Sequence, residues 1–136
     1  MANTLRLEIV TPDAKTYSED VEMVTLPGIE GEMGIYPQHV PVLTQIVPGE
    51  IIVRKDGQEY ALAIGEGFVG ITGERVAIMA DMAIRAENID EAQAEEARRR
   101  AEARLNETLD DEEAAMVNAA LAHSLAQLKV KRRQTR

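Results

Sequence analysis

Glycine and proline occur in only one part of this 136-residue chain. All nine glycines lie between Gly28 and Gly73, and all five prolines lie between Pro12 and Pro48. Both residue types disfavour long helices and permit tight turns, so the segment that lacks them is free to form helices. The sequence therefore predicts a β-rich domain over residues 1–87 and a helical domain over residues 88–136.

The first domain contains short segments in which apolar and polar residues alternate with the period of a β-strand. The clearest pair, residues 51–54 and 59–64, flanks Asp56-Gly57, a dipeptide that readily adopts the positive φ angles of a hairpin turn. Residues 68–72 and 75–80 flank Gly73-Glu74 in the same way, and further strands are expected over residues 5–9, 21–26 and 40–47. Many short strands joined by turns predict a sandwich or a barrel.

Two capping patterns divide the second domain into two helices. Asn88 with Glu91 resembles a capping box, so the first helix is expected to begin at Asn88, and Thr108 with Asp111 gives the same pattern for the second helix. Because the connection over residues 106–110 is short, the helices are expected to form an antiparallel hairpin. The expected apolar stripes are Ile89, Ala92, Ala97, Ala101 and Leu105, then Ala114, Val117, Leu121, Leu125 and Leu128.

The seam between the two predicted helices is rich in alanine. Burial of a leucine side chain contributes about 1.5–3 kcal/mol, whereas an alanine methyl group contributes only about 0.8 kcal/mol. Both helices have strong intrinsic propensity and capping residues, so separating them costs little helicity. The hairpin is therefore expected to open readily. The alternative is a static alanine-rich pair with a basic C-terminal tail.

The composition excludes several classes of function. The chain has 24 acidic and 15 basic residues, a net charge of −9, and only 3% aromatic residues. Negative charge repels phosphates and few aromatic rings are available to stack on bases, so we expect no nucleic-acid partner. Cysteine is absent, which excludes disulfides, thiolate nucleophiles and cysteine-based metal sites.

No targeting or membrane-spanning segment is expected. The first ten residues alternate between polar and apolar and include Arg6 and Glu8, which is unlike a signal peptide. The longest uncharged segment, residues 33–49, contains three prolines and is shorter than the roughly 20 apolar residues that a helix needs to cross a bilayer. We therefore expect a cytoplasmic location, with any membrane association indirect.

Residues 65–70 read GEGFVG and match the G-x-G-x-x-G pattern of dinucleotide-binding loops. In those loops a strand precedes the glycines and a helix follows them, whereas here a strand is predicted to follow. The preferred interpretation is a turn or a close backbone approach where a strand begins.

No catalytic constellation is visible, so we do not expect an enzyme. The two histidines, His39 and His123, are far apart in the sequence and have no accompanying nucleophile or metal-ligand cluster. His123 is expected to be solvated on the second helix. His39 lies between Pro37 and Pro41, where it has either a local hydrogen-bonding role or an interface role.

One long segment carries a family resemblance. Residues 30–44 read EGEMGIYPQHVPVLT and are followed by Pro48-Gly49. Together with VTP at 10–12, GFV at 67–69, AD at 80–81 and AENID at 86–90, this segment resembles the epsilon subunits of F-type ATP synthases. The resemblance covers nearly the whole chain. It implies an α+β fold, with an N-terminal antiparallel β-sandwich followed by a C-terminal antiparallel two-helix hairpin.

In that family the β-sandwich lies at the foot of the central stalk, against the γ subunit and the membrane-embedded c ring. The resemblance implies a non-catalytic rotor subunit that couples c-ring rotation to ATP synthesis through γ, on the cytoplasmic face of the plasma membrane or of the thylakoid membrane. Glu32 is the implied contact to the c ring, with a solvated turn residue as the alternative, and His39 is the implied contact to γ. The full implied contact set is Gly31, Glu32, Gly34, His39 and Pro41, in a loop that Pro37 also shapes.

In bacterial members the hairpin extends along γ into the hexamer of α and β subunits. Its basic residues meet an acidic segment of the catalytic β subunit there and restrain ATP hydrolysis. The resemblance implies such contacts for Arg98, Arg99, Arg100, Arg104, Lys129, Lys131, Arg132 and Arg133. The alternative is a purely structural stalk connector whose hairpin stays folded.

Some family members bind ATP between the folded helices through the pattern Ile-Asp-x-x-Arg-Ala. Here residues 89–94 read IDEAQA, so Gln93 stands where that pattern has arginine, while Ile89, Asp90 and Arg100 remain as nucleotide-binding candidates. Loss of a charge-assisted phosphate contact costs about 1.5–3 kcal/mol, or one to two decades of affinity. We therefore expect weak or absent ATP binding and no cofactor.

Overall fold

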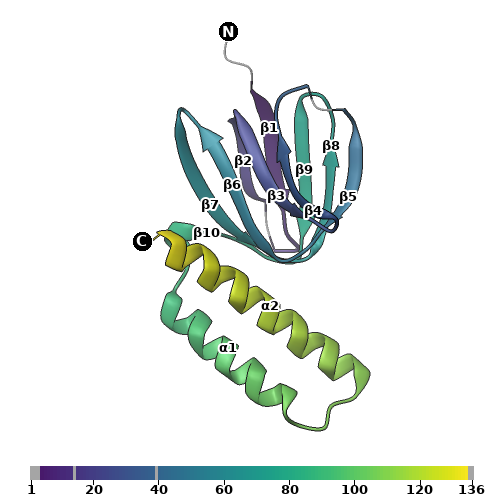
Figure 1. Cartoon of the computed structure of the whole chain (residues 1–136), viewed down its shortest axis with the longest axis vertical. Coiled ribbons are helices and arrows are strands. Elements are labelled where there is room, and N and C mark those ends of the chain that lie inside the picture. The colour runs from purple at the N-terminus through teal and green to yellow at the C-terminus, as the bar shows by residue number, and fades with distance from the viewer. Residues whose placement is uncertain (1–3, 14, 39, 135–136) are drawn as a thin grey trace.

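The computed structural model describes residues 4–13, 15–38 and 40–134. They form a curled sheet of ten strands followed by two helices that lie across one end of it (Figure 1). This arrangement confirms the predicted α+β fold, a β-sandwich followed by a helical hairpin.

The strands are β1 (Leu5–Val10), β2 (Lys15–Val21), β3 (Met23–Gly28), β4 (Gly31–Ile35), β5 (Val42–Ile46), β6 (Gly49–Lys55), β7 (Gln58–Ile64), β8 (Gly67–Ile71), β9 (Arg75–Ala80) and β10 (Ala83–Arg85). A short 3₁₀ turn, η1 (Ala86–Asn88), leads into α1 (Glu91–Leu105) and α2 (Asp111–Gln134).

The strands follow the order β10-β7-β6-β3-β5-β8-β9-β1-β2, with β4 paired to β3. The paired strands run antiparallel except β1 and β9, which run parallel from Arg6 opposite Arg75 to Val10 opposite Met79. The parallel pair joins strands that are far apart in the sequence, so local periodicity does not specify it.

Strands from the two ends of the sheet order meet as the sheet curls. The Arg85 guanidinium on β10 lies 4.9 Å from the ring centroid of Tyr17 on β2, a cation–π contact. Lys55 on β6 contacts Glu19 on β2 with an Nζ to Oε1 distance of 3.2 Å. Burial raises the pKa of the Tyr17 hydroxyl above its ordinary value, and a hydrogen bond with Glu19 raises it further. These contacts join the two ends of the curled sheet.

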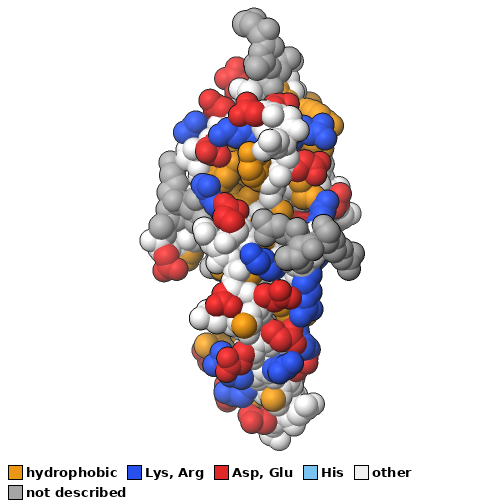
Figure 2. Space-filling view, turned by 90° about the vertical axis from the view of Figure 1, so that its left-hand side faces the viewer, with side chains coloured by type: hydrophobic (Ala, Val, Ile, Leu, Met, Phe, Trp, Pro, Cys, Tyr) orange, Lys and Arg blue, Asp and Glu red, His pale blue; other side chains and the backbone are white. Residues whose placement is uncertain are grey.

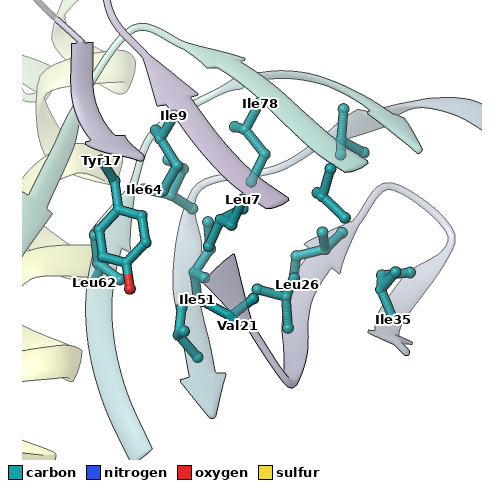
Figure 3. Close-up of a cluster of buried hydrophobic side chains, with 14 of the residues drawn as sticks. Leu7, Ile9, Tyr17, Val21, Leu26, Ile35, Ile51, Leu62, Ile64 and Ile78 are labelled. Atoms are coloured by element: carbon teal, nitrogen blue, oxygen red, sulfur yellow. The ribbon is translucent and has the colours of Figure 1, made fainter. Parts of the chain in front are cut away.

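The main hydrophobic core fills the interior of the sandwich with aliphatic side chains and Tyr17 (Figure 3). Alternation places Leu5, Leu7 and Ile9 of β1 inward, while the residues between them face outward or lie partly exposed. Ile51 and Ile78 reach the same cluster from β6 and β9. The core is therefore built by the two-residue period that the sequence predicted.

Two glycine predictions are confirmed. Asp56 and Gly57 have φ angles of 53° and 76°, so they form the hairpin turn between β6 and β7. At the start of β8, an added Cβ on Gly67 would lie 1.9 Å from the backbone oxygen of Met79 and 2.8 Å from the Cα of Ala80. The GEGFVG segment is thus a close backbone approach at a strand entry.

Besides shifts of one or two residues at strand ends and the unpredicted strands β2 and β10, the structure corrects three of the sequence predictions. Residues 21–26 do not form one strand, because β2 ends at Val21 and β3 begins at Met23, and the Glu22 amide donates instead to the Arg54 carbonyl at 2.8 Å. The strand expected over 40–47 is shorter, Val42–Ile46. Residues 31–35, expected within a loop, form β4 because they pair with β3.

Both predicted helix starts are wrong by two or three residues. Residues 86–88 form the 3₁₀ turn η1, so α1 begins at Glu91 and its N-cap is Asp90, whose Oδ1 accepts from the Gln93 amide at 3.1 Å. Asp110 plays the same part for α2, accepting from the Glu113 amide at 2.7 Å. This hydrogen bond lowers the pKa of the Asp110 carboxyl. Aspartate caps as effectively as asparagine or threonine, so the pattern alone did not choose between neighbouring candidates.

The apolar stripe predicted for α2 is only partly correct. α2 lies between the sheet and α1 (Figure 1), so two of its faces are covered rather than one. Ala126 and Val130 pack with Ala63 of β7, and Leu128 is buried as well. Leu125, which the sequence analysis placed in the apolar stripe, is 47% exposed.

The stripe of α1 is also corrected. Ala94 and Ala101 are its buried residues, whereas Ala92 and Leu105 are exposed.

Candidate partner-binding surfaces

The implied contact residues Gly31, Glu32 and Gly34 lie on β4, which pairs with β3. All three are exposed. Gly31 has a φ of 131°, which residues with a side chain rarely adopt, so glycine at this position permits the tight turn between β3 and β4. Glu32 follows directly after this turn. The fold thus presents a carboxylate to solvent at this end of the sandwich.

The contiguous segment 31–41 does not form a single surface. Gly28, beside the β3–β4 turn, pairs with Ile46 at the end of β5, whereas Pro41 immediately precedes the start of β5. Glu32 and Pro41 therefore lie toward opposite ends of β5, as the β3–β4 turn and the β4–β5 connection do in Figure 1. Pro41 is exposed. His39 lies outside the described residues.

The connection between β4 and β5 rests on the β8–β9 turn. The Gln38 amide donates to the Gly73 carbonyl, and Gln38 has a φ of 68°. Pro37 is partly buried beside it. This backbone contact holds the described part of the connection against the sandwich.

A band of large apolar side chains lies on the outer face of four adjacent strands. It consists of Val10 on β1, Met79 on β9, Phe68 on β8 and Leu43 on β5, and we call it the apolar band. Val10 pairs with Met79 and Met79 pairs with Phe68, while Leu43 pairs with Gly70 on the same strand as Phe68. Leu43 is 77% exposed. Contiguous exposed apolar side chains of this kind mark interaction sites.

The sequence analysis missed the apolar band. The sequence does contain a sign of the apolar band. In β8 and β9 inward and outward residues alternate, and Phe68 and Met79 occupy outward positions where polar residues are usual. Recognising it required the register that sets Phe68 opposite Met79. A groove of about 480 Å³ continues the surface past Leu43, Gly70 and Ala77.

The basic residues of α1 form ion pairs within the hairpin. Arg98 donates to Glu95 on the same helix, and this bond is the main reason that the pKa of the Glu95 carboxyl falls to about 2. Arg99 also approaches Glu95, at 3.5 Å. Arg104 reaches across the hairpin to Glu113 on α2 at 3.3 Å. Charges of both signs therefore cover the hairpin surface, as Figure 2 shows for one side.

The basic residues of the C-terminal tail are also engaged inside the chain. Lys131 contacts a backbone carbonyl of η1, Arg132 contacts two acids of α1, and Arg133 contacts an acid of β6. Lys129 and Arg100 are exposed, and neither forms an ion pair with another described residue. Most of the eight basic candidates thus have an internal partner in this folded arrangement.

The far half of the hairpin encloses a wide groove between the helices. The groove has a volume of about 830 Å³, and Ala97, Ala101, Val117 and Ala120 line it together with Arg100. Small side chains leave this part of the seam unfilled. The alanine-rich seam predicted from the sequence is therefore present, and little apolar area joins the helices there.

The three nucleotide-binding candidates do not converge. Ile89 is buried in a small cluster with Ala63, and Asp90 is occupied as the N-cap of α1. Arg100 lies ten residues beyond Asp90 on the helix, about 15 Å along its axis. Gln93, at the position where the ATP-binding pattern has arginine, is exposed.

His123 is not simply solvated, contrary to the sequence prediction. Its Nε2 lies 3.1 Å from the Asp81 Oδ1 in the turn between β9 and β10. Gly65 makes room for this contact, because an added Cβ there would lie 1.9 Å from the Asp81 oxygen and 3.0 Å from the His123 nitrogen. The middle of α2 is therefore docked on the sandwich through a polar contact between residues distant in the sequence.

The fold and its surfaces define a class of protein, a β-sandwich subunit that carries a helical hairpin docked across one end. Residues 4–86 match the family model described as "ATP synthase, Delta/Epsilon chain, beta-sandwich domain". Residues 87–132 match the model described as "ATP synthase, Delta/Epsilon chain, long alpha-helix domain". The chain therefore belongs to the ATP synthase delta/epsilon chain family, and the resemblance recognised in the sequence is confirmed.

Relatives match over nearly their full length. The chain is 40% identical over 129 residues to the ATP synthase epsilon chain of Laribacter hongkongensis (strain HLHK9), covering 93% of this chain and 92% of that one. It is 42% identical over 127 residues to the ATP synthase epsilon chain of Dehalococcoides mccartyi (strain CBDB1), covering 93% and 91%.

A solved structure is also similar. It is a chain in the cryo-EM structure of Euglena gracilis mitochondrial ATP synthase, OSCP/F1/c-ring in rotational state 1, with a TM-score of 0.77, 25% identity and coverage of 95% of this chain and 81% of that one. Neither helix within the described ranges has the length and apolar character needed to cross a bilayer.

Proposed function

We propose that this chain is a non-catalytic rotor subunit in the central stalk of a proton-translocating F-type ATP synthase. It couples c-ring rotation to ATP synthesis through γ and restrains ATP hydrolysis through its C-terminal hairpin. It is a peripheral membrane protein held by the complex on the cytoplasmic face of the plasma membrane or of the thylakoid membrane. Family membership over nearly the whole chain supports the stalk role.

The apolar band carries the proposal that the sandwich docks on another subunit. Val10, Met79 and Phe68 lie opposite one another on three strands, and Leu43 on β5 lies diagonally beyond Phe68, opposite Gly70, so together they offer a strip of apolar surface that a partner can cover. We assign this face to γ. Glu32 projects from the end of the sandwich opposite Pro41 and suits the polar loops of the c ring.

Charge substitution in the apolar band tests the γ contact. The double variant Leu43→Glu/Phe68→Glu places two carboxylates where apolar surface would be buried against γ. Each carboxylate weakens binding, because its charge must lose its hydration when the interface forms. We expect the Kd for an α3β3γ complex to rise at least tenfold, about 1.4 kcal/mol or more. The measurement is a binding titration with the labelled chain.

Tyr60→Glu is the matched control, because Tyr60 is an exposed aromatic residue on β7, outside the apolar band. It should bind as the unaltered chain does. Thermal unfolding of each variant checks that the sandwich is intact. Unchanged affinity of a folded double variant would remove the apolar band from the γ interface.

The hairpin supports the proposed restraint of hydrolysis. Its far seam is a wide groove whose apolar lining is mostly alanine, and the helices keep their own caps at Asp90 and Asp110. Separation of this far part of the seam therefore exposes little apolar area, and the basic side chains can then exchange their internal acids for acidic groups of the catalytic β subunit. The alternative function, a structural connector whose hairpin never leaves the sandwich, needs only the docked arrangement.

We expect weak or absent ATP binding by the isolated chain. Asp90 is occupied by capping, Gln93 carries no charge, and Arg100 stands about 15 Å away along α1. In the groove between the helices Arg104 is already paired with Glu113, so among the two arginines that line it only Arg100 is left for the phosphates of a nucleotide. Calorimetry with magnesium and ATP should give no heat of binding at micromolar concentrations, and a micromolar Kd would contradict this expectation.

A further inference from the structure

Three successive residues near the end of α2 reach three different elements of the fold. The Lys131 Nζ donates to the carbonyl oxygen of Ala86 in η1 at 3.4 Å. Arg132 binds Glu91 and Glu95 of α1, at 3.0 Å each. Arg133 donates through Nη1 to a carboxylate oxygen of Glu50 on β6. One turn of helix therefore joins η1, the neighbouring helix and the sheet.

Glu50 is the most enclosed of the three carboxylates that this turn of helix binds. The Glu50 side chain is 6% exposed, whereas that of Arg133 is 53% exposed. The second carboxylate oxygen, Oε2, is buried and has no hydrogen-bond partner among the described residues. Among the described residues Arg133 is the cation paired with Glu50, and a buried carboxylate that loses its paired cation remains desolvated and uncompensated. Departure of Arg133 therefore favours withdrawal of the whole helix end, which returns Glu50 to water.

The cations that bind these internal acids include those that the proposed function assigns to an acidic partner. A guanidinium that pairs with Glu50 cannot at the same time pair with a carboxylate of another subunit in the same way. From this we infer that Lys131, Arg132 and Arg133 form a latch that keeps the hairpin closed and docked on the β-sandwich. Arg133 ties α2 to the sheet through Glu50, Lys131 ties it to η1, and Arg132 ties it to α1. An acidic protein surface releases the latch by replacing Glu50, Glu91 and Glu95 as partners of the two arginines. The inference rests on the proposed function for the identity of that surface.

The cations of the latch can pair either with acids of this chain, in the docked state, or with acids of the partner, in the extended state. Arg133 stabilises the docked state through Glu50 and the extended state through the partner, so its removal affects both states. Glu50 contacts Arg133 only when the hairpin is docked. A change at Glu50 therefore separates the latch from the contacts made after extension.

Charge reversal at Glu50 is the principal test. The variant Glu50→Lys places a second cation against Arg133, so we expect the undocked fraction of the isolated full chain to rise at least tenfold. Fluorescence energy transfer reports undocking, with dyes on cysteines introduced at the exposed positions Thr72 and Asn118. The chain contains no cysteine of its own, which makes the labelling specific. Glu74→Lys, the same reversal at an exposed position in the β8–β9 turn, is the matched control and should leave the transfer unchanged.

Two further variants guard against a folding defect at the enclosed position. Arg133→Glu changes a half-exposed side chain, opposes Glu50 with a like charge, and should raise the undocked fraction as well. The exchanged pair Glu50→Lys/Arg133→Glu should restore docking to within about twofold of the unaltered chain, as a pairwise interaction requires. Equal transfer in Glu50→Lys, Arg133→Glu and Glu74→Lys would overturn the latch.

Hydrolysis measured with the same full-length variants separates the latch from the proposed function. In an α3β3γ complex, Glu50→Lys should strengthen inhibition, whereas the exchanged pair should not, because it has lost a cation needed after extension. Undocking without any change in hydrolysis would leave the latch standing and contradict the inhibitory function. Stronger inhibition without undocking would contradict the latch alone.

Discussion

A chain that ends at Glu87 is expected to bind an α3β3γ complex as the full chain does, and to leave its ATP hydrolysis unrestrained. The main core, from Leu5 to Ala80, lies entirely within the retained part. The hairpin contributes only a smaller cluster on the outside of the sandwich, in which Ala126 and Val130 cover Ala63. Because the apolar band and Glu32 are also retained, docking should persist.

The measurement is the hydrolysis rate of the complex alone, with the full chain and with the truncated chain, each after stoichiometric binding is verified. Inhibition by the full chain alone establishes the hairpin as the regulatory element. Equal binding with no inhibition by either form would favour the alternative function, a structural connector. Failure of both forms to bind would remove the stalk assignment.

A milder change than truncation removes only the positive charges at the C-terminal end of α2. A chain with Lys129, Lys131, Arg132 and Arg133 replaced by glutamine should bind normally but inhibit less, and its residual inhibition should depend less on salt. This loss should occur even though the latch is also weakened, because the extended hairpin then lacks the charges that hold it on its partner. Equal inhibition by both chains across salt concentrations would exclude an electrostatic contact.

The second large effect concerns Gly67. An alanine there would place its Cβ 1.9 Å from the Met79 oxygen and 2.8 Å from the Ala80 Cα, which are backbone atoms of the paired strand. Backbone cannot move aside as a flexible side chain can, so β8 and β9 must separate at this point. We expect Gly67→Ala to lower the free energy of unfolding by about 3 kcal/mol, measured by urea denaturation.

Gly70→Ala is the matched control on the same strand. The nearest atom to an added Cβ at Gly70 is the Leu43 Cδ1, at 4.0 Å, an ordinary contact. Its effect on stability should stay below about 1 kcal/mol. Similar losses for both variants would show that the close approach at Gly67 is not what restricts this position.

The choice of N-cap residue is one feature that local sequence does not decide. Asn88, Asp90, Thr108 and Asp110 are all competent N-caps by chemistry. In α1 the cap is Asp90 because residues 86–88 form η1, which packs Ala86 against the sheet, and in α2 the cap is Asp110. Local sequence therefore located each helix start to within a few residues, and for α1 packing selected the capping residue.

Some features of this protein were determined by the sequence itself. The confinement of glycine and proline, the two-residue period of β1 and the Asp56-Gly57 turn specified a β domain followed by two helices. Such features depend on backbone dihedral preferences and on side-chain periodicity within a few residues, which a single chain displays directly.

Other features were decided only by the tertiary structure. The parallel pairing of β1 with β9, the assembly of the apolar band and the pairing of Glu50 with Arg133 each join residues that are distant along the chain. Whether Leu125 is buried depends on which two faces of α2 are covered, and the answer is set by the position of α2 between the sheet and α1. The physical reason is that a charge or a methyl group is equally compatible with many partners until the fold brings one of them within contact distance.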